Sequence, residues 1–134
     1  MDVVADVVHL PFISECFDRV YLRHVLEHVN DLAALQEAKR VLKSGGSIHV
    51  EVPNAYYLPI ILRYSLKSRY SVSREHIHAY GEVELSNLLE ASGFQKVRIG
   101  YSSYAPRHQP KPSILENFIP VHLRGQISAE ANKP

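Results

Sequence analysis

Histidine and carboxylate side chains gather in two short stretches of this chain. The first stretch contains His24, Glu27 and His28, and the second contains His76 and His78. An unperturbed imidazole titrates at about pH 6.5, so each histidine could accept or donate a proton near neutral pH. Imidazole and carboxylate groups can also ligate a metal ion together. The residue types alone therefore indicate general acid–base chemistry or a metal site.

The spacing of the first stretch, His-x-x-Glu-His, is also the zinc-binding pattern of the inverzincin peptidases. On a helix, His24 and His28 would share one face. Zinc chemistry would need a distant acidic third ligand, for which Glu84 and Glu90 are arbitrary choices. The second pair of histidines lacks a third ligand as well. We therefore predict no metal site.

Composition and charge describe one ordinary soluble domain. The 134 residues are 46% apolar and 22% charged, and a net charge of +1 gives no general signal for nucleic acid. Cys16 is the single cysteine, which excludes an intramolecular disulfide, and no apolar run approaches the roughly 20 residues of a membrane span. The start carries Asp2 and Asp6 and does not resemble a signal peptide. We expect a cytoplasmic protein without a transmembrane segment.

The elements that must position these side chains alternate between strand and helix periods. Such alternation is typical of an α/β domain with a mostly parallel sheet. A helix is predicted to begin at Asp31 as its N-cap and to stop at Gly45 and Gly46. Strands are expected at 3–5, 18–22, 48–52 and 97–101, and helices at 31–42 and 83–89, the latter ended by Gly93.

The carboxyl-terminal stretch 105–134 contains Pro106, Pro110, Pro112 and Pro120 and few apolar runs. Proline punctuates regular structure, so we expect a tail with little helix or strand over much of its length. The preceding part, residues 1–104, is expected to be the domain.

Eight short motifs follow one another along the chain with regular spacing. Each motif is weak alone, but chance would rarely place all eight in this order. In this order they resemble the class I SAM-dependent methyltransferases of the type 11 group, over residues 2 to 101. The motifs are Asp6, Leu10-Pro11-Phe12, Phe17-Asp18, His24-Val25-Leu26-Glu27-His28, Arg40-Val41-Leu42-Lys43, Gly45-Gly46, Val52-Pro53-Asn54 and Ala91-Ser92-Gly93-Phe94.

The resemblance implies a fold and a cofactor. The fold would be an incomplete Rossmann-like three-layer αβα sandwich, with a mostly parallel sheet and an antiparallel carboxyl-terminal strand. In this family S-adenosyl-L-methionine (SAM) lies across the carboxyl ends of the strands. By resemblance, the acid Asp6 would accept a hydrogen bond from the adenine amine, although Asp6 alone is equally well explained as a turn residue. The cofactor would be contacted by Asp6, Val7, Leu22, Arg23 and His24.

The chain also departs from the family pattern. The first strand and its acidic-Gly-x-Gly turn have no counterpart, because all six glycines lie at position 45 or later. We therefore expect a truncated domain whose unpaired strand edge recruits a second copy or a partner chain, and whose SAM binding is weak or lost. Two interpretations stay open: a methyltransferase acting on a small-molecule or lipid-like acceptor, and a non-catalytic methyltransferase-like protein that serves as a dimerisation or partner-binding module.

Methyl transfer mainly requires a nucleophile held in line with an activated methyl group. A general base helps only when the acceptor is protonated, and His24 and His28 are the candidates for that base. Their alternative role is structural, as a capping or satisfied pair beside Glu27.

Residues 55–80 occupy the position at which relatives insert a substrate lid. The stretch is hydrophobic, aromatic and basic, which suits an anionic or lipid-like acceptor, and it would equally suit an acidic membrane surface or a dimer interface. The histidines in it would otherwise face solvent or fix the following helix. Its candidate acceptor contacts are Tyr56, Tyr57, His76, His78 and Tyr80.

Overall fold

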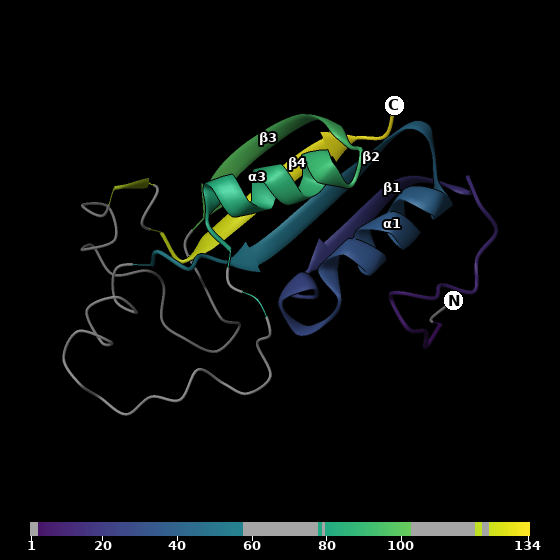
Figure 1. Cartoon of the computed structure of the whole chain (residues 1–134), viewed down its shortest axis with the longest axis horizontal. Helices are drawn as coiled ribbons and strands as arrows, with labels where there is room; N and C mark the ends of the chain where they lie inside the picture. The colour runs from purple at the N-terminus through teal and green to yellow at the C-terminus, as the bar shows by residue number, and fades with distance from the viewer. Residues whose placement is uncertain (1–2, 58–77, 79, 103–119, 122–123) are drawn as a thin grey trace.

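A computed structural model describes residues 3–57, 78, 80–102, 120–121 and 124–134 (Figure 1). The described residues form a four-stranded sheet, two α-helices and one short 3-10 helix. In chain order the elements are β1 (Phe17–Arg23), η1 (Leu26–His28), α1 (Asp31–Val41), β2 (Leu42–Pro53), α3 (Glu82–Ala91), β3 (Gln95–Ser102) and β4 (Gln126–Asn132).

The sheet is mixed, with the strand order β1-β2-β4-β3. β1 and β2 are parallel and joined through α1, whereas β4 is antiparallel to both of its neighbours. The pairs Leu22↔Val50 and Val52↔Ile127 fix the register across the middle of the sheet. The predicted Rossmann-like α/β fold with an antiparallel carboxyl-terminal strand is confirmed.

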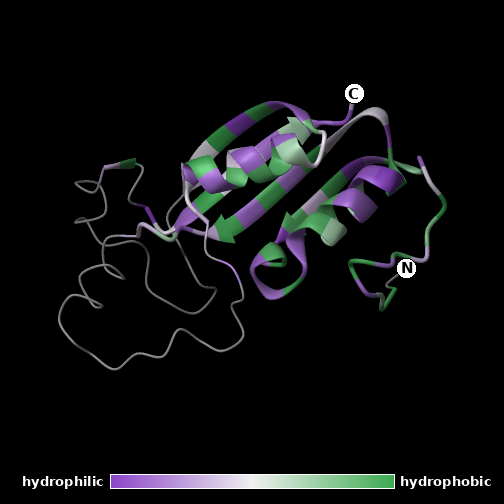
Figure 2. Ribbon diagram, viewed as in Figure 1, coloured by the Kyte–Doolittle hydropathy of each residue, from purple (hydrophilic) through white to green (hydrophobic). Residues whose placement is uncertain are grey.

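Both helices cover the same face of the sheet (Figure 1). Alternate residues of the strands point to this face, and Figure 2 shows the resulting alternation of hydrophobic and hydrophilic residues along β2. Full burial of a leucine or isoleucine contributes about 2 kcal/mol, so this single core carries most of the stabilisation. Fully buried members include Leu35 from α1, Leu85 and Leu89 from α3, Ile48, Val50 and Val52 from β2, and Ile127 from β4.

Helix α1 begins and ends slightly earlier than the sequence predicts. Its N-cap is Asn30, whose side-chain oxygen accepts a hydrogen bond from the Ala33 amide at 3.0 Å, and Asp31 is the first helical residue. The helix ends at Val41, because Leu42 turns to extended backbone and enters the core. The sequence predicted that Gly45 and Gly46 stop the helix. Both glycines instead lie within β2, where Gly45 has a φ of 77°.

The ends of the chain differ in two places from what the sequence suggested. Residues 3–5 form no strand; Val4 is fully exposed, and only an isolated bridge joins Asp6 to His9. Residues 126–132 lie inside the sheet, because β4 fills the space between β2 and β3. The stretch 105–134 is therefore not wholly a tail.

In the described part of the chain, no helix is both long enough and apolar enough to cross a membrane.

Candidate functional site

The carboxyl ends of the two parallel strands meet at one edge of the sheet. β4 begins at this edge, because it runs antiparallel to β2. In open α/β sheets ligands bind outside the carboxyl ends of the strands. Three polar residues lie at this end of the sheet: His24 directly after β1, Asn54 directly after β2, and Gln126 at the start of the antiparallel strand β4. We call this end of the sheet the carboxyl edge.

His24 is held on both sides of its ring. Its backbone adopts a left-handed conformation with φ 52°, which histidine tolerates better than most residues. Ring atom Nε2 lies 2.8 Å from the side-chain nitrogen of Gln126, and Nδ1 lies 3.3 Å from Glu27 Oε1. An amide nitrogen only donates, so Nε2 accepts and the ring proton sits on Nδ1, from which it is donated to Glu27.

Glu27 is the most deeply buried charged residue of this edge, with a side chain only 2% exposed. Its Oε1 also lies 3.9 Å from His28 Nε2, while the His28 side chain is 38% exposed. Its Oε2 is buried and has no hydrogen-bond partner among the described residues. A buried carboxylate in this setting gives the edge a negative potential, which favours a cationic group nearby.

Tyr80 and His78 are tied to the same region. The Tyr80 hydroxyl donates to Asp31 Oδ2 at 2.8 Å and also lies near the Leu26 carbonyl. The His78 amide donates to the Glu27 carbonyl at 3.4 Å, and its ring lies 3.9 Å from Asp31 Oδ2. Burial, followed by the hydrogen bond to Asp31, raises the pKa of Tyr80 above its ordinary range. Tyr80 is therefore a neutral, buried donor.

Asn54 organises the end of β2. It is 1% exposed, and its side-chain nitrogen donates to the Arg124 carbonyl at 2.7 Å. Its side-chain oxygen accepts from the Tyr56 amide at 2.9 Å, and the Tyr57 amide donates to its backbone carbonyl. Tyr56 and Tyr57 therefore lie beside the carboxyl edge. His76 lies outside the described residues.

The remaining predicted cofactor residues lie in the amino-terminal segment and at the end of β1. Asp6 Oδ1 accepts from the Val8 amide at 3.1 Å, which is the turn role weighed as an alternative, and Val7 packs against the core. Leu22 points into the core, while exposed Arg23 forms an ion pair with Glu51 at 2.8 Å. A contact from Leu22 to a ligand would therefore have to come from its backbone.

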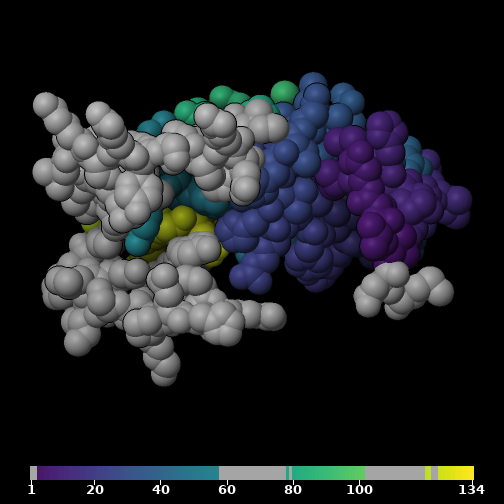
Figure 3. All heavy atoms as spheres, turned by 90° about the horizontal axis from the view of Figure 1, so that it is seen from below, coloured from purple at the N-terminus to yellow at the C-terminus, as the bar shows by residue number. Residues whose placement is uncertain are grey.

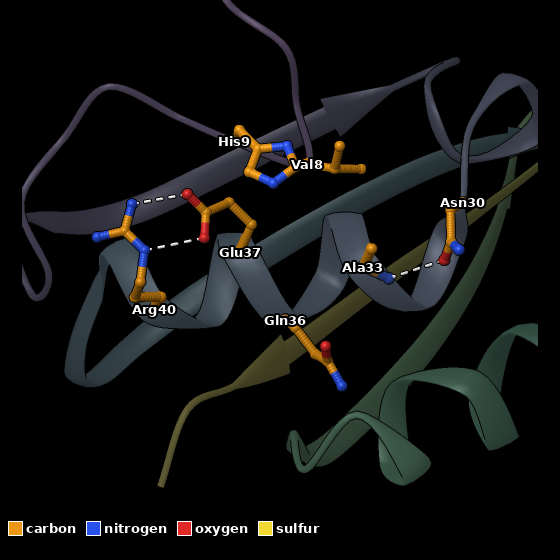
Figure 4. A pocket seen from close by; sticks show the side chains of 7 residues that line it. All are labelled: Val8, His9, Asn30, Ala33, Gln36, Glu37 and Arg40. Carbon is orange, nitrogen blue, oxygen red and sulfur yellow. Dashed lines mark hydrogen bonds and ion pairs between the residues drawn. The ribbon is translucent and has the colours of Figure 1, made fainter.

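A hollow of about 560 Å³ lies beside α1 (Figure 4). At one end of it, Arg40 holds both oxygens of Glu37 at 2.7 and 2.8 Å. This pairing lowers the pKa of Glu37 to about 2, and Glu37 Oε1 also accepts from the Leu10 amide. The hollow is lined by Val8, His9, Asn30, Ala33, Gln36, Glu37 and Arg40.

The His-x-x-Glu-His pattern does not lie on an α-helix. His24 precedes η1 in a left-handed conformation, so its ring and that of His28 do not share a helical face. Over the described ranges, no three His, Cys, Asp or Glu side chains are arranged to hold a metal ion.

Sequence reasoning found the contiguous residues of the edge and missed those that are distant in sequence. Asn54 appeared only as the end of a motif, and Gln126 lay in the presumed tail. The polar residue directly after a buried Val-x-Val strand was the available signal for Asn54. No local signal marks Gln126, because its role depends on the pairing of β4.

Comparison with known proteins agrees with the fold. A methyltransferase-domain family model matches residues 4–99. A SAM-dependent methyltransferase of Thermotoga maritima superposes with a TM-score of 0.74 at 19% identity, over 97% of this chain and 62% of its own. A methyltransferase of Haloferax volcanii, solved with the activator Trm112, gives a TM-score of 0.64 at 18% identity, over 98% of this chain and 60% of that chain.

An uncharacterized protein of Methanocaldococcus jannaschii is 48% identical over 52 residues, which are 39% of this chain and 23% of that protein. The chain thus spans less than two thirds of the length of these relatives. Fold and edge together define a class I methyltransferase architecture. Because the family model covers most of the chain, the chain belongs to the methyltransferase-domain family.

Proposed function

We propose that this chain binds SAM at the carboxyl edge and transfers its methyl group to a small-molecule or lipid-like acceptor. One observation carries the proposal: in a chain of the methyltransferase-domain family, His24, Glu27 and Gln126 form a connected polar cluster where the parallel strands end.

The residues of the edge and of the amino-terminal segment fit the chemical groups of SAM. Asp6 Oδ2 takes part in no hydrogen bond among the described residues, so it can accept from the exocyclic amine of adenine. Half-buried Val7 supplies an apolar surface beside it. The unpartnered buried oxygen of Glu27 provides negative potential that suits a sulfonium cation. The hollow beside α1 adjoins the adenine contacts through Val8.

Bound SAM supplies an electrophilic methyl group that needs no further activation. The chain has to align the acceptor and, where the acceptor is protonated, remove its proton. We assign proton removal to His28, whose side chain is the more exposed of the two imidazoles that contact Glu27. His24 is assigned a positioning role, because both of its ring nitrogens have partners.

Acceptor contacts are assigned to residues of the 55–80 stretch that border the edge. Tyr56 and Tyr57 follow Asn54, and His78 contacts Glu27 and Asp31. Tyr80 supports these residues from its buried position. The contribution of His76, and a lid formed by the whole stretch, stay predictions, as does the cytoplasmic location.

The proposed cofactor site can be tested by calorimetric titration of the purified chain with SAM. We expect micromolar affinity that weakens about tenfold in Asp6→Ala, which corresponds to the loss of one hydrogen bond to the base. Asp18→Ala is the matched control, because Asp18 is exposed and pairs with Lys43 at the opposite end of β1. Absence of heat at millimolar SAM would contradict cofactor binding by this chain.

A second candidate function is partner binding, and the position of β1 favours it. β1 is an edge strand of the described sheet, and Tyr21 on it is 64% exposed. Unpaired strand edges recruit other strands. We propose that a second copy or a partner chain pairs with the unpaired side of strand β1. Light scattering after size-exclusion chromatography tests it: a mass of twice 15.2 kDa supports self-pairing. A monomer that captures no partner would oppose the idea.

A further inference from the structure

Arg124 is fixed at the carboxyl edge by its backbone. Its carbonyl accepts from the buried Asn54 side chain at 2.7 Å, and the next carbonyl, of Gly125, accepts from the Asn54 amide at 3.0 Å. Two residues further along, Gln126 contacts the His24 ring. The segment 124–126 therefore connects the end of β2 with the candidate site.

The guanidinium of Arg124 is incompletely satisfied. The residue is half-buried, and its Nε is excluded from solvent without a hydrogen-bond partner in the described part of the chain. A buried donor left unpaired is destabilising, and more so when it is charged. Arginine in such a position suits a carboxylate or phosphate, because the guanidinium can donate two parallel hydrogen bonds to either anion.

The carboxylates around the edge already have other partners. Glu27 contacts His24 and His28, and Asp31 contacts Tyr80 and His78. Glu51 pairs with Arg23 and His49. No ion pair joins Arg124 to a carboxylate among the residues described. An anion bound at this edge would complete its contacts.

The position of Arg124 indicates which ligand carries that anion. Seen from below, the yellow atoms of the carboxyl-terminal segment lie on one side of the blue β1–α1 region, and the purple amino-terminal segment lies on the other (Figure 3). The predicted adenine contacts Asp6 and Val7 belong to that amino-terminal segment. The carboxyl-terminal segment, to which Arg124 belongs, thus lies on the side away from the expected adenine contacts.

We propose that Arg124 binds a carboxylate or phosphate group of the methyl acceptor, so that the substrate class is an anionic acceptor. The assignment of this anion to an acceptor rests on the proposed methyltransferase function. The cofactor also carries a carboxylate, and this second source of the same chemistry has to be separated by experiment.

The first arm of the test uses inorganic phosphate and acetate as probes, without SAM. Either anion is titrated into the intact chain while the backbone amide signals of Asn54, Gly125 and Gln126, which lie beside Arg124 and are present in every variant, are followed by NMR. We expect a saturable shift that weakens at least about tenfold in Arg124→Gln, equal to roughly 1.4 kcal/mol. Arg124→Lys keeps the charge but loses the planar pair of N–H donors, so it should retain part of the anion binding. It replaces Arg124→Gln in the comparison if the Gln variant fails to fold.

Arg98→Gln is the matched control, because Arg98 is exposed and pairs with Glu130 at 3.0 Å on the sheet surface. It should bind both probes as the parent chain does. Equal anion binding by the parent chain and Arg124→Gln, or no saturable binding by the parent chain, would overturn the proposal.

The second arm measures SAM affinity of the same variants by calorimetry. We expect Arg124→Gln to bind SAM within about twofold of the parent chain, because the acceptor anion is a separate group. A tenfold loss of SAM affinity in this variant would assign Arg124 to the cofactor carboxylate and overturn the acceptor proposal. If no variant binds SAM but the anions still depend on Arg124, the anion site stands while the methyltransferase function fails.

Discussion

The side-chain nitrogen of Gln126 lies 2.8 Å from Nε2 of His24, and these two residues are 102 positions apart in the sequence. The contact joins the first residue of β4 to the residue that follows β1. It makes the carboxyl-terminal strand part of the candidate site, because it determines which nitrogen of His24 carries the proton.

Replacing Gln126 with alanine should release the His24 ring. We expect a loss of about 1 kcal/mol in the free energy of unfolding, because His24 Nε2 loses its donor. Histidine NMR should then show mixed tautomers of His24, where the parent chain has the proton on Nδ1. Gln95→Ala is the control, since Gln95 is exposed on β3. An unchanged tautomer in Gln126→Ala would contradict the contact.

Replacing Glu27 with glutamine removes the negative charge of the side chain and keeps its size. The amide keeps an oxygen near His24 but removes the negative charge that supports proton removal by His28. We expect methyl transfer at pH 7 to slow about tenfold to a hundredfold. SAM affinity should change less than the rate. Glu90→Gln, on the exposed side of α3, should leave both unchanged; equal rates for Glu27→Gln and the parent chain would rule out the assigned role.

The Glu37–Arg40 ion pair should make the folding stability depend on pH in the acidic range. The hydrogen bonds from Arg40 lower the pKa of Glu37 from 4.5 to about 2. A carboxyl with a lowered pKa stabilises the folded state above its unfolded pKa, and this contribution is lost as the pH falls through the folded value. Glu37→Gln should therefore lower the urea midpoint at pH 7, and the gap to the parent chain should close between about pH 4.5 and pH 2. A constant gap over this range would contradict the pairing.

Tyr80→Phe tests the connection between residue 80 and the start of α1. The variant keeps the buried ring and removes the hydroxyl that contacts Asp31 Oδ2 at 2.8 Å. We expect a loss of about 1 to 2 kcal/mol in urea unfolding, because a charged acceptor loses its donor. Tyr21→Phe makes the same chemical change at an exposed position and should cost almost nothing. Equal stability of the two variants would show that the Asp31 contact contributes little.

Much of the fold follows from local patterns in the sequence. The helical spacing of the apolar residues predicted a buried stripe on α1: Leu35, Ala38, Val41 and Leu42 are buried, whereas Leu32 is 43% exposed. The alternation of Ile48, Val50 and Val52 predicted the core face of β2. Gly93, with φ 82°, ends the α3 region as expected. In each case the residues that decide the structure are neighbours in sequence.

The parts that were not predicted depend on contacts between distant segments. β4 reads Gln-Ile-Ser-Ala-Glu-Ala-Asn, which has little intrinsic strand preference, and it is a strand because two neighbours pair with it. Arg124 and Gln126 join the site through that pairing. His24, Glu27 and His28 could be predicted because one short motif contains all three.

The most direct test is an amide NMR titration of the intact chain with SAM. SAM bound at the carboxyl edge, with its adenine against the amino-terminal segment, predicts saturable shifts at Leu22–His28 and at Asp6–Val8. Little change is expected at Gly45 and Gly93, which lie toward the other end of the sheet. Shifts confined to that other end, or no shifts at millimolar SAM, would contradict a cofactor site at the carboxyl edge.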